Sequence, residues 1–170
     1  MSTALMYGLY VSAAGIILTL IMHFAGLWQP ETMWIGYLGY IFLIVGIAMA
    51  IKERRDTDNG GEIRFGQAFS TGFTVVLISS MIGSIFFYIY AEMINPDMMT
   101  TIREGMEQSL EAQRSTMSAE EFEATRDATL MFAQPSLMAI WQLLGSMLIG
   151  SVITAITAAI LKRPPQPQVM

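Results

Sequence analysis

Three polar side chains lie within or beside long apolar stretches of the sequence: His23, Glu92 and Gln142. Polar groups inside a bilayer are costly, so those that occur there often serve proton or ion transfer. We expect all three near the outer ends of membrane-spanning helices, where His23 and Glu92 could form a proton-linked pair or hold a cation. The alternative, which we favour because none lies at mid-membrane, is that water or lipid headgroups solvate each residue separately.

The residue types needed for most other chemistry are missing. The chain has no Cys and a single His, which excludes disulfides, thiolate catalysis and Cys- or His-rich metal sites. Asp56 and Asp58 resemble the opening of a calcium-binding loop, but Gly60 and Gln67 occupy positions five and twelve of it, where oxygen ligands are needed. We therefore predict no enzyme activity, no metal and no cofactor. A net charge of -5 also argues against nucleic acid as a partner.

The elements that must hold these residues are long apolar helices. Of the 170 residues, 54% are hydrophobic and only 14% are charged, whereas soluble domains carry about 25% charged residues. Apolar runs, uncharged apart from Glu92, cover about residues 4–25, 33–51, 66–93 and 136–161. Each is near or above the roughly 20 residues that cross a bilayer as a helix, and none alternates as a barrel strand would. We predict an all-α membrane protein with four transmembrane helices in one domain, residues 1–170.

Basic residues indicate the orientation of these helices. They gather in the turn at residues 52–65 and just after the last apolar run, and cytoplasmic loops are enriched in Lys and Arg. Both termini and this turn should therefore be cytoplasmic, which in a bacterium places the protein in the inner membrane. The cluster of Lys52, Arg54 and Arg55 could also hold an anionic lipid headgroup. Nearby acidic residues weaken that interpretation and favour a topology signal alone.

The segment between the third and fourth apolar runs, about residues 95–135, carries the acidity of the chain. Nine acidic residues and three arginines lie between Glu92 and Pro135. Asn95 and Pro96 form a typical helix start. An apolar residue follows at every fourth position, at Met98, Ile102, Met106 and Leu110.

A second helix is predicted after the first in this segment. Ser118 and Glu121 have the spacing of a capping box, in which each residue caps the other at a helix start. We therefore predict an extramembrane amphipathic helical hairpin, which either caps the bundle or projects from it. Its acidic residues Glu104, Glu107 and Glu111 should dock a protein partner by steering a basic surface.

Small residues recur at helical spacing in the first and fourth apolar runs. They are Gly8, Ser12, Gly15, Ser146, Gly150, Thr154 and Ala158. Little hydrophobic force acts between helices inside a membrane, so small residues that allow close backbone approach commonly mark packing faces. We predict that these faces pack helices of the same chain, with a second subunit as the alternative.

Several stretches resemble one family. They are Ile51-Lys-Glu-Arg-Arg-Asp, Gly61-Glu-Ile-Arg-Phe-Gly-Gln-Ala-Phe, Ile94-Asn-Pro, and Tyr7-Gly8 near the start. Together they resemble the bacterial family catalogued as domain of unknown function 4199, found mostly in Bacteroidota, over nearly the whole chain. The resemblance implies a four-helix inner-membrane protein and brings no activity.

The sequence therefore leads to two function hypotheses of different classes. The first is a non-enzymatic inner-membrane protein, either an accessory subunit or a self-associating component, that docks through its acidic outer segment. The alternative is a small proton-coupled transporter that uses His23, Glu92 and Gln142.

Overall fold

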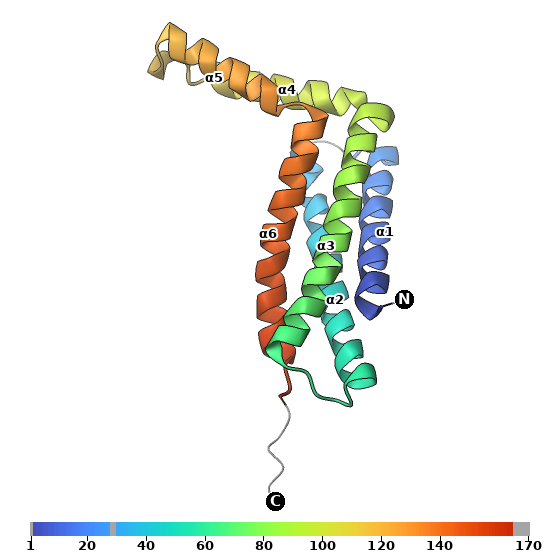
Figure 1. The fold of residues 1–170 in the computed structure, drawn as a ribbon. Coiled ribbons are helices and arrows are strands. Elements are labelled where there is room, and N and C mark those ends of the chain that lie inside the picture. Colours follow the sequence, from blue (N-terminus) through green and yellow to red (C-terminus); the bar gives the residue numbers. More distant parts are fainter. Residues whose placement is uncertain (1, 28–29, 165–170) are drawn as a thin grey trace, which may run out of the picture. The chain divides into compact units, whose positions relative to one another are not determined.

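The computed structural model describes residues 2–27 and 30–164, with side chains described outside residues 30–33. The elements are helical (Figure 1), and in chain order they are α1 (Thr3–Phe24), η1 (Pro30–Tyr37), α2 (Leu38–Glu53), η2 (Arg54–Asp58), α3 (Phe65–Ile89), η3 (Tyr90–Ile94), α4 (Pro96–Glu111), η4 (Arg114–Thr116), α5 (Ala119–Phe132) and α6 (Pro135–Leu161). No β-strand occurs in the described ranges, where Ile63 and Arg163 form an isolated bridge. The all-α prediction is confirmed.

Four helices are long and apolar enough to cross a membrane: Thr3–Phe24, Trp34–Asp58, Phe65–Ile94 and Pro135–Leu161. They suggest a multi-pass membrane protein, as the sequence predicted. Three of them match the predicted boundaries closely, but the second continues well beyond residue 51. The prediction ended that run at the first charge, whereas charged side chains at a helix end reach water without breaking the helix.

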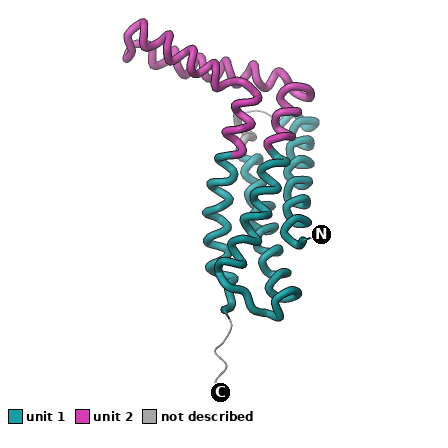
Figure 2. The backbone as a smooth tube through the Cα atoms, viewed as in Figure 1, with its two compact units in different colours: residues 1–83, 144–170 teal, residues 84–143 magenta. Residues whose placement is uncertain are grey.

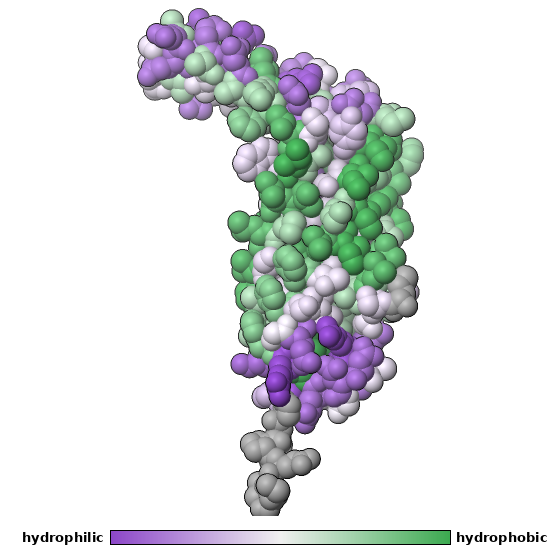
Figure 3. Space-filling view, in the orientation of Figure 1, coloured by the Kyte–Doolittle hydropathy of each residue, from purple (hydrophilic) through white to green (hydrophobic). Residues whose placement is uncertain are grey.

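The described chain folds as two compact units (Figure 2). Unit 1 comprises residues 1–83 and 144–170, and unit 2 comprises residues 84–143. Along the helices of unit 1, hydrophobic side chains dominate the visible face, and hydrophilic ones gather at the end that carries η2 (Figure 3). In unit 2, the visible face of α4 and α5 is largely hydrophilic. Apolar sides with polar ends are typical of helices surrounded by lipid.

The interior of unit 1 is built from aliphatic and small side chains. Ile47, Val75, Val76 and Ala158 are completely buried and belong to one hydrophobic cluster. Large apolar residues on the outer sides of the same helices are exposed, as at Ile160. An extended exposed apolar surface of this kind marks contact with a partner or with lipid.

Close helix contacts in unit 1 occur at glycines. The position that a Cβ atom would take on Gly8 of α1 lies 2.8 Å from Cβ of Ile78 on α3. The corresponding position on Gly150 of α6 lies 2.5 Å from Cγ1 of Val76, also on α3. At these two glycines, the neighbouring helix therefore belongs to the same chain.

Other predicted packing residues line the same interior. Ser12 is buried, and its hydroxyl donates to the carbonyl of Gly8 at 2.7 Å. Thr154 is completely buried, and its Cγ2 lies 2.7 Å from the Cβ position of Gly72 on α3. Ala158 follows one turn later, also completely buried. The methyl group of Thr154 thus occupies the space left by a glycine.

Gly15 differs from this pattern, and Ser146 is intermediate. A Cβ atom on Gly15 would meet no described atom within 4 Å, so no close helix contact requires a glycine there. Ser146 is half-buried. Spacing identifies a row of small residues, but it does not specify how far along that row the neighbouring helix stays close.

The end of α2 is tied to the end of α6 within unit 1. Arg55 is 7% exposed, and its Nε and Nη2 atoms donate to the Asp56 carboxylate at 2.6 and 3.0 Å. Its Nη1 atom donates to the carbonyl of Leu161 at 3.4 Å. A cation is favourable beside the last carbonyls of a helix. Backbone hydrogen bonds of 2.8 and 2.9 Å also join Ile63 to Arg163.

Candidate functional site

In unit 2, α4 and α5 begin at recognisable start signals. Pro96 opens α4, but the side chain of Asn95 makes no capping hydrogen bond. Its Nδ2 atom instead donates to the hydroxyl of Tyr90 at 3.2 Å. At the start of α5, Oγ of Ser118 accepts the N–H of Glu121 at 3.3 Å, and Glu121 accepts the N–H of Ser118 at 2.9 Å. The predicted capping box is confirmed.

The capping box changes the acidity of Glu121. The backbone N–H of Ser118 donates to the charged carboxylate and, with a further contribution from the Ser118 side chain, holds the pKa of Glu121 below its usual range. The carboxylate of Glu121 therefore serves to cap the start of α5.

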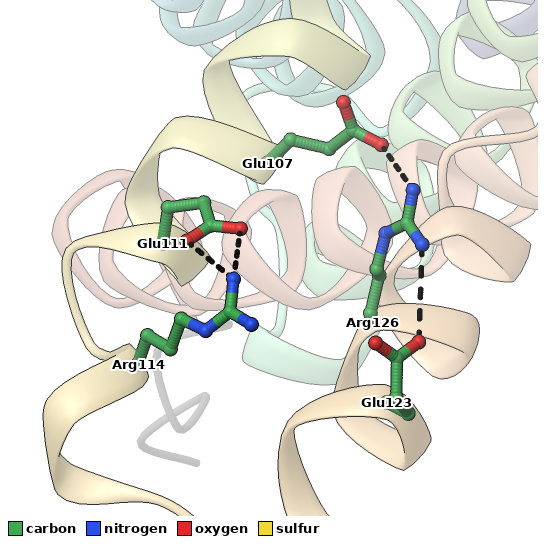
Figure 4. Close-up of polar contacts among 5 residues, drawn as sticks. All are labelled: Glu107, Glu111, Arg114, Glu123 and Arg126. Carbon is green, nitrogen blue, oxygen red and sulfur yellow. Dashed lines mark hydrogen bonds and ion pairs between the residues drawn. The ribbon is translucent and has the colours of Figure 1, made fainter. Parts of the chain in front are cut away.

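Two arginines join α4 to α5. Arg126 of α5 lies 3.6 Å from the carboxylate of Glu107 on α4 and 3.8 Å from that of Glu123 on its own helix (Figure 4). Arg103 of α4 donates through Nε to the carbonyl of Ala133 at 3.2 Å, at the end of α5. These contacts hold α4 and α5 side by side. We call these two helices the α4–α5 pair.

The remaining arginine of the pair acts at its far end. Arg114, in η4, donates to both carboxylate oxygens of Glu111 at 3.2 and 3.4 Å (Figure 4). Its guanidinium also lies 4.9 Å from the ring centre of Phe122 on α5, a favourable cation–π distance. All three arginines between Glu92 and Pro135 therefore make contacts inside the pair.

The three residues predicted to dock a partner are consequently not equivalent. Glu107 and Glu111 form ion pairs inside the α4–α5 pair. Glu104 is exposed and forms no ion pair with any residue in the described ranges. Glu107 and Glu111 thus help to hold the pair together, whereas the charge of Glu104 is available to a partner.

An apolar cleft, which the sequence did not reveal, opens in unit 2. It has a volume of about 650 Å³ and is lined by Phe87, Met106, Phe132, Met138, Trp141 and Gln142. A neighbouring cleft of about 510 Å³ runs along α4 and α5 and shares Met106 and Phe132 with it. The rings of Phe132 and Trp141 lie 6.1 Å apart at one wall. We call the larger of the two the apolar cleft.

Sequence signals for the apolar cleft were present but incomplete. Met106 belongs to the predicted apolar stripe of α4, while Trp141 lies in the fourth predicted membrane span, residues 136–161. A helical stripe identifies a face of one helix but not the helix that packs against it. The meeting of residues from four helices could therefore not be predicted from spacing.

The three-residue polar cluster is distributed over the two units. His23 lies in the last turn of α1 in unit 1, with its ring 5.2 Å from that of Phe24. Glu92 in η3 is exposed, and Gln142 lines the apolar cleft, both in unit 2. Convergence of the three residues therefore stays a prediction. Within the described ranges, no three His, Asp or Glu side chains gather to hold a metal ion.

These features define a class of protein: an all-helical chain with four candidate membrane-spanning helices and a pair of helices between the third and fourth. More specifically, the chain belongs to the family described as "Protein of unknown function (DUF4199)", whose model matches residues 6–163. This membership confirms the resemblance found in the sequence. No curated protein and no solved structure matches the chain.

Proposed function

We propose that the protein is a non-enzymatic, multi-pass protein of the bacterial inner membrane that docks a protein partner through its α4–α5 pair. It would act as an accessory subunit or as a self-associating component. In this proposal, the four apolar helices cross the bilayer with both termini in the cytoplasm. The α4–α5 pair then forms a hairpin outside the membrane on the opposite face.

One observation carries this proposal: all three arginines of the segment make contacts inside the pair. The pair is therefore built before any partner arrives. A surface that is ordered in advance loses less conformational entropy on binding than a flexible one. Because the internal contacts use every arginine, Glu104 and other exposed acids give the outer surface a negative field that attracts a basic partner.

In this proposal, the apolar cleft supplies the second part of a docking surface at the membrane boundary, because residues of the pair meet there the ends of the third and fourth candidate spans. Phe132 is 47% exposed and Trp141 is 57% exposed, although both are large aromatic residues. Large aromatic side chains that enter pockets supply much of the binding energy at protein interfaces. An apolar anchor on a surface that also carries acidic residues would combine affinity with orientation.

Mutation of the apolar cleft tests the proposal. We expect Met106→Ser to remove a co-purifying protein, or to convert a self-associated form to monomer, when the full chain is purified in mild detergent. Met131→Ser is the matched control, because Met131 is 60% exposed on α5 and does not line the apolar cleft. Light scattering and mass spectrometry of the purified sample would measure both outcomes.

Two outcomes of this experiment would contradict the proposal. If the wild-type protein purifies as a monomer without a partner, or if both Met variants lose their partner equally, docking through this surface is wrong. Circular dichroism and thermal unfolding of each variant would separate loss of docking from loss of folding.

A further inference from the structure

A polar cleft of about 450 Å³ opens in unit 1 where the ends of three helices meet. Its walls are the first residues of α1, Arg54 and Asp58 of η2, and Thr71 and Thr74 of α3. The first candidate span begins at Thr3 and the second ends at Asp58, so the polar cleft lies at the ends of candidate spans. If these helices cross a bilayer, the polar cleft lies at the level of the lipid headgroups.

Arg54 is held in this cleft with most of its donors unused. Its Nη1 atom donates to Oγ1 of Thr71 at 2.7 Å, and Thr71, which is 1% exposed, donates in turn to the carbonyl of Gln67 at 2.8 Å. A guanidinium has five N–H donors, and the others have no partner in the described part of the chain. Arg55, in contrast, uses Nε, Nη1 and Nη2 inside the fold.

A carboxylate lines the same cleft. Asp58 is exposed and forms no ion pair with Arg54 or with any other described cation. A positioned cation and a carboxylate that share an open cleft without pairing suit a ligand with both charges better than a simple anion. The N–H of Leu5 at the start of α1 donates to Oγ of Ser2 at 3.4 Å. The N–H groups of Thr3 and Ala4, which lack acceptors inside the helix, favour the phosphate end of such a ligand.

We propose that this cleft binds the headgroup of phosphatidylethanolamine. Arg54 would donate hydrogen bonds to the phosphodiester, and Asp58 would accept them from the primary ammonium group. The choice of ethanolamine over choline follows from hydrogen bonding, because a quaternary ammonium has no N–H to donate. Lys52 is exposed and does not line the polar cleft, so Arg54 alone of the three basic residues takes this role. This site rests on the membrane location proposed above.

Native mass spectrometry of the full chain in mild detergent tests the site. Dioleoyl phosphatidylethanolamine, phosphatidylglycerol and phosphatidylcholine are added in separate titrations. We expect the wild type to bind phosphatidylethanolamine about tenfold more tightly than phosphatidylcholine, as the loss of one charge-assisted hydrogen bond implies. Arg54→Gln should weaken binding of all three lipids. Asp58→Asn should abolish the preference for ethanolamine over choline and leave phosphatidylglycerol binding intact.

Lys52→Gln is the matched control, because it removes the same charge from a neighbouring residue outside the polar cleft. Equal affinity of the wild type for the three lipids would overturn the proposal, as would an equal loss in Lys52→Gln. Displacement of the lipid by millimolar inorganic phosphate would show a free-anion site and would also overturn it. Should Arg54→Gln fail to fold, the exposed Asp58→Asn variant still measures the headgroup preference.

Flotation with phospholipid vesicles separates this proposal from the membrane location on which it rests. A wild-type protein that fails to float contradicts the membrane location itself. A protein that floats and shows no ethanolamine preference contradicts only the headgroup site.

Discussion

Val76 of α3 occupies the space that a side chain on Gly150 of α6 would need. Its Cγ1 and Cγ2 atoms lie 2.5 and 2.9 Å from the position of a Cβ atom on that glycine. Both residues are buried in unit 1. A branched side chain on α3 therefore packs directly against a glycine of α6, where no other residue would fit without a shift.

This relationship predicts an unequal response to one added methyl group. Gly150→Ala should lower the free energy of unfolding by about 1–3 kcal/mol, because overpacking forces Val76 or the backbone to move. Gly145→Ala, on the same helix, is the control, since a Cβ atom there meets no described atom within 4 Å. It should leave stability unchanged or raise it slightly. Chemical unfolding in detergent, followed by circular dichroism, would measure both variants, and equal stabilities would contradict the packing.

The ion pair between Arg126 and Glu107 predicts a small, salt-dependent coupling. Their side chains are 45% and 44% exposed, and pairs of this kind contribute roughly 0.2–1 kcal/mol. A double-mutant cycle with Glu107→Gln and Arg126→Gln should give a coupling energy in that range at low salt. The coupling should fall when salt screens the charges. A coupling that is unaffected by salt would point to packing as its origin.

The capping box predicts a pH dependence at the start of α5. Since hydrogen bonds from Ser118 lower the folded-state pKa of Glu121, its stabilising contribution is complete above the unfolded carboxyl pKa and is lost as the pH falls through the folded value. NMR of the labelled protein in micelles should show the Ser118 amide shifting in acid. Glu121→Gln retains a capping acceptor that does not titrate, so its Ser118 amide should stay constant over that transition.

Charge distribution predicts which segments face the cytoplasm. The chain has no native Cys, so single introduced cysteines report without background. Thr57 and Thr116 are both exposed. In intact cells with a permeable outer membrane, Thr116→Cys should react with an impermeant thiol reagent and Thr57→Cys should not. The reverse pattern would invert the proposed orientation.

Periodicity and local signals predicted much of the helical content. The apolar runs found the candidate spans because a charge inside a bilayer is costly, and Ser118 with Glu121 found a helix start because a capping box requires that spacing. The second helix continues past residue 51, where its predicted span ends, because Lys52 and the residues after it remain helical. Composition predicts which residues can lie inside a bilayer. It does not predict where a helix ends, because the helix continues as long as its backbone hydrogen bonds do.

The contacts between helices could not be predicted from the sequence. Gly8 and Gly15 belong to the same row of small residues, yet only Gly8 lies against a neighbour that a Cβ atom would strike. Likewise, Arg54 and Arg55 are adjacent basic residues, but Arg55 is committed to Asp56 and Arg54 faces the polar cleft. The position of the neighbouring helix decides which of two similar residues makes a packing contact or a hydrogen bond. A single sequence does not specify that position.

The backbone bridge between Ile63 and Arg163 has a consequence for biosynthesis. Its two residues are separated by most of the chain, so the turn after α2 cannot be completed while the third and fourth apolar helices are still being made. Contacts of such long sequence separation form slowly and late. During synthesis, this bridge between the segment after η2 and the end of α6 therefore forms only after the last helix has been made.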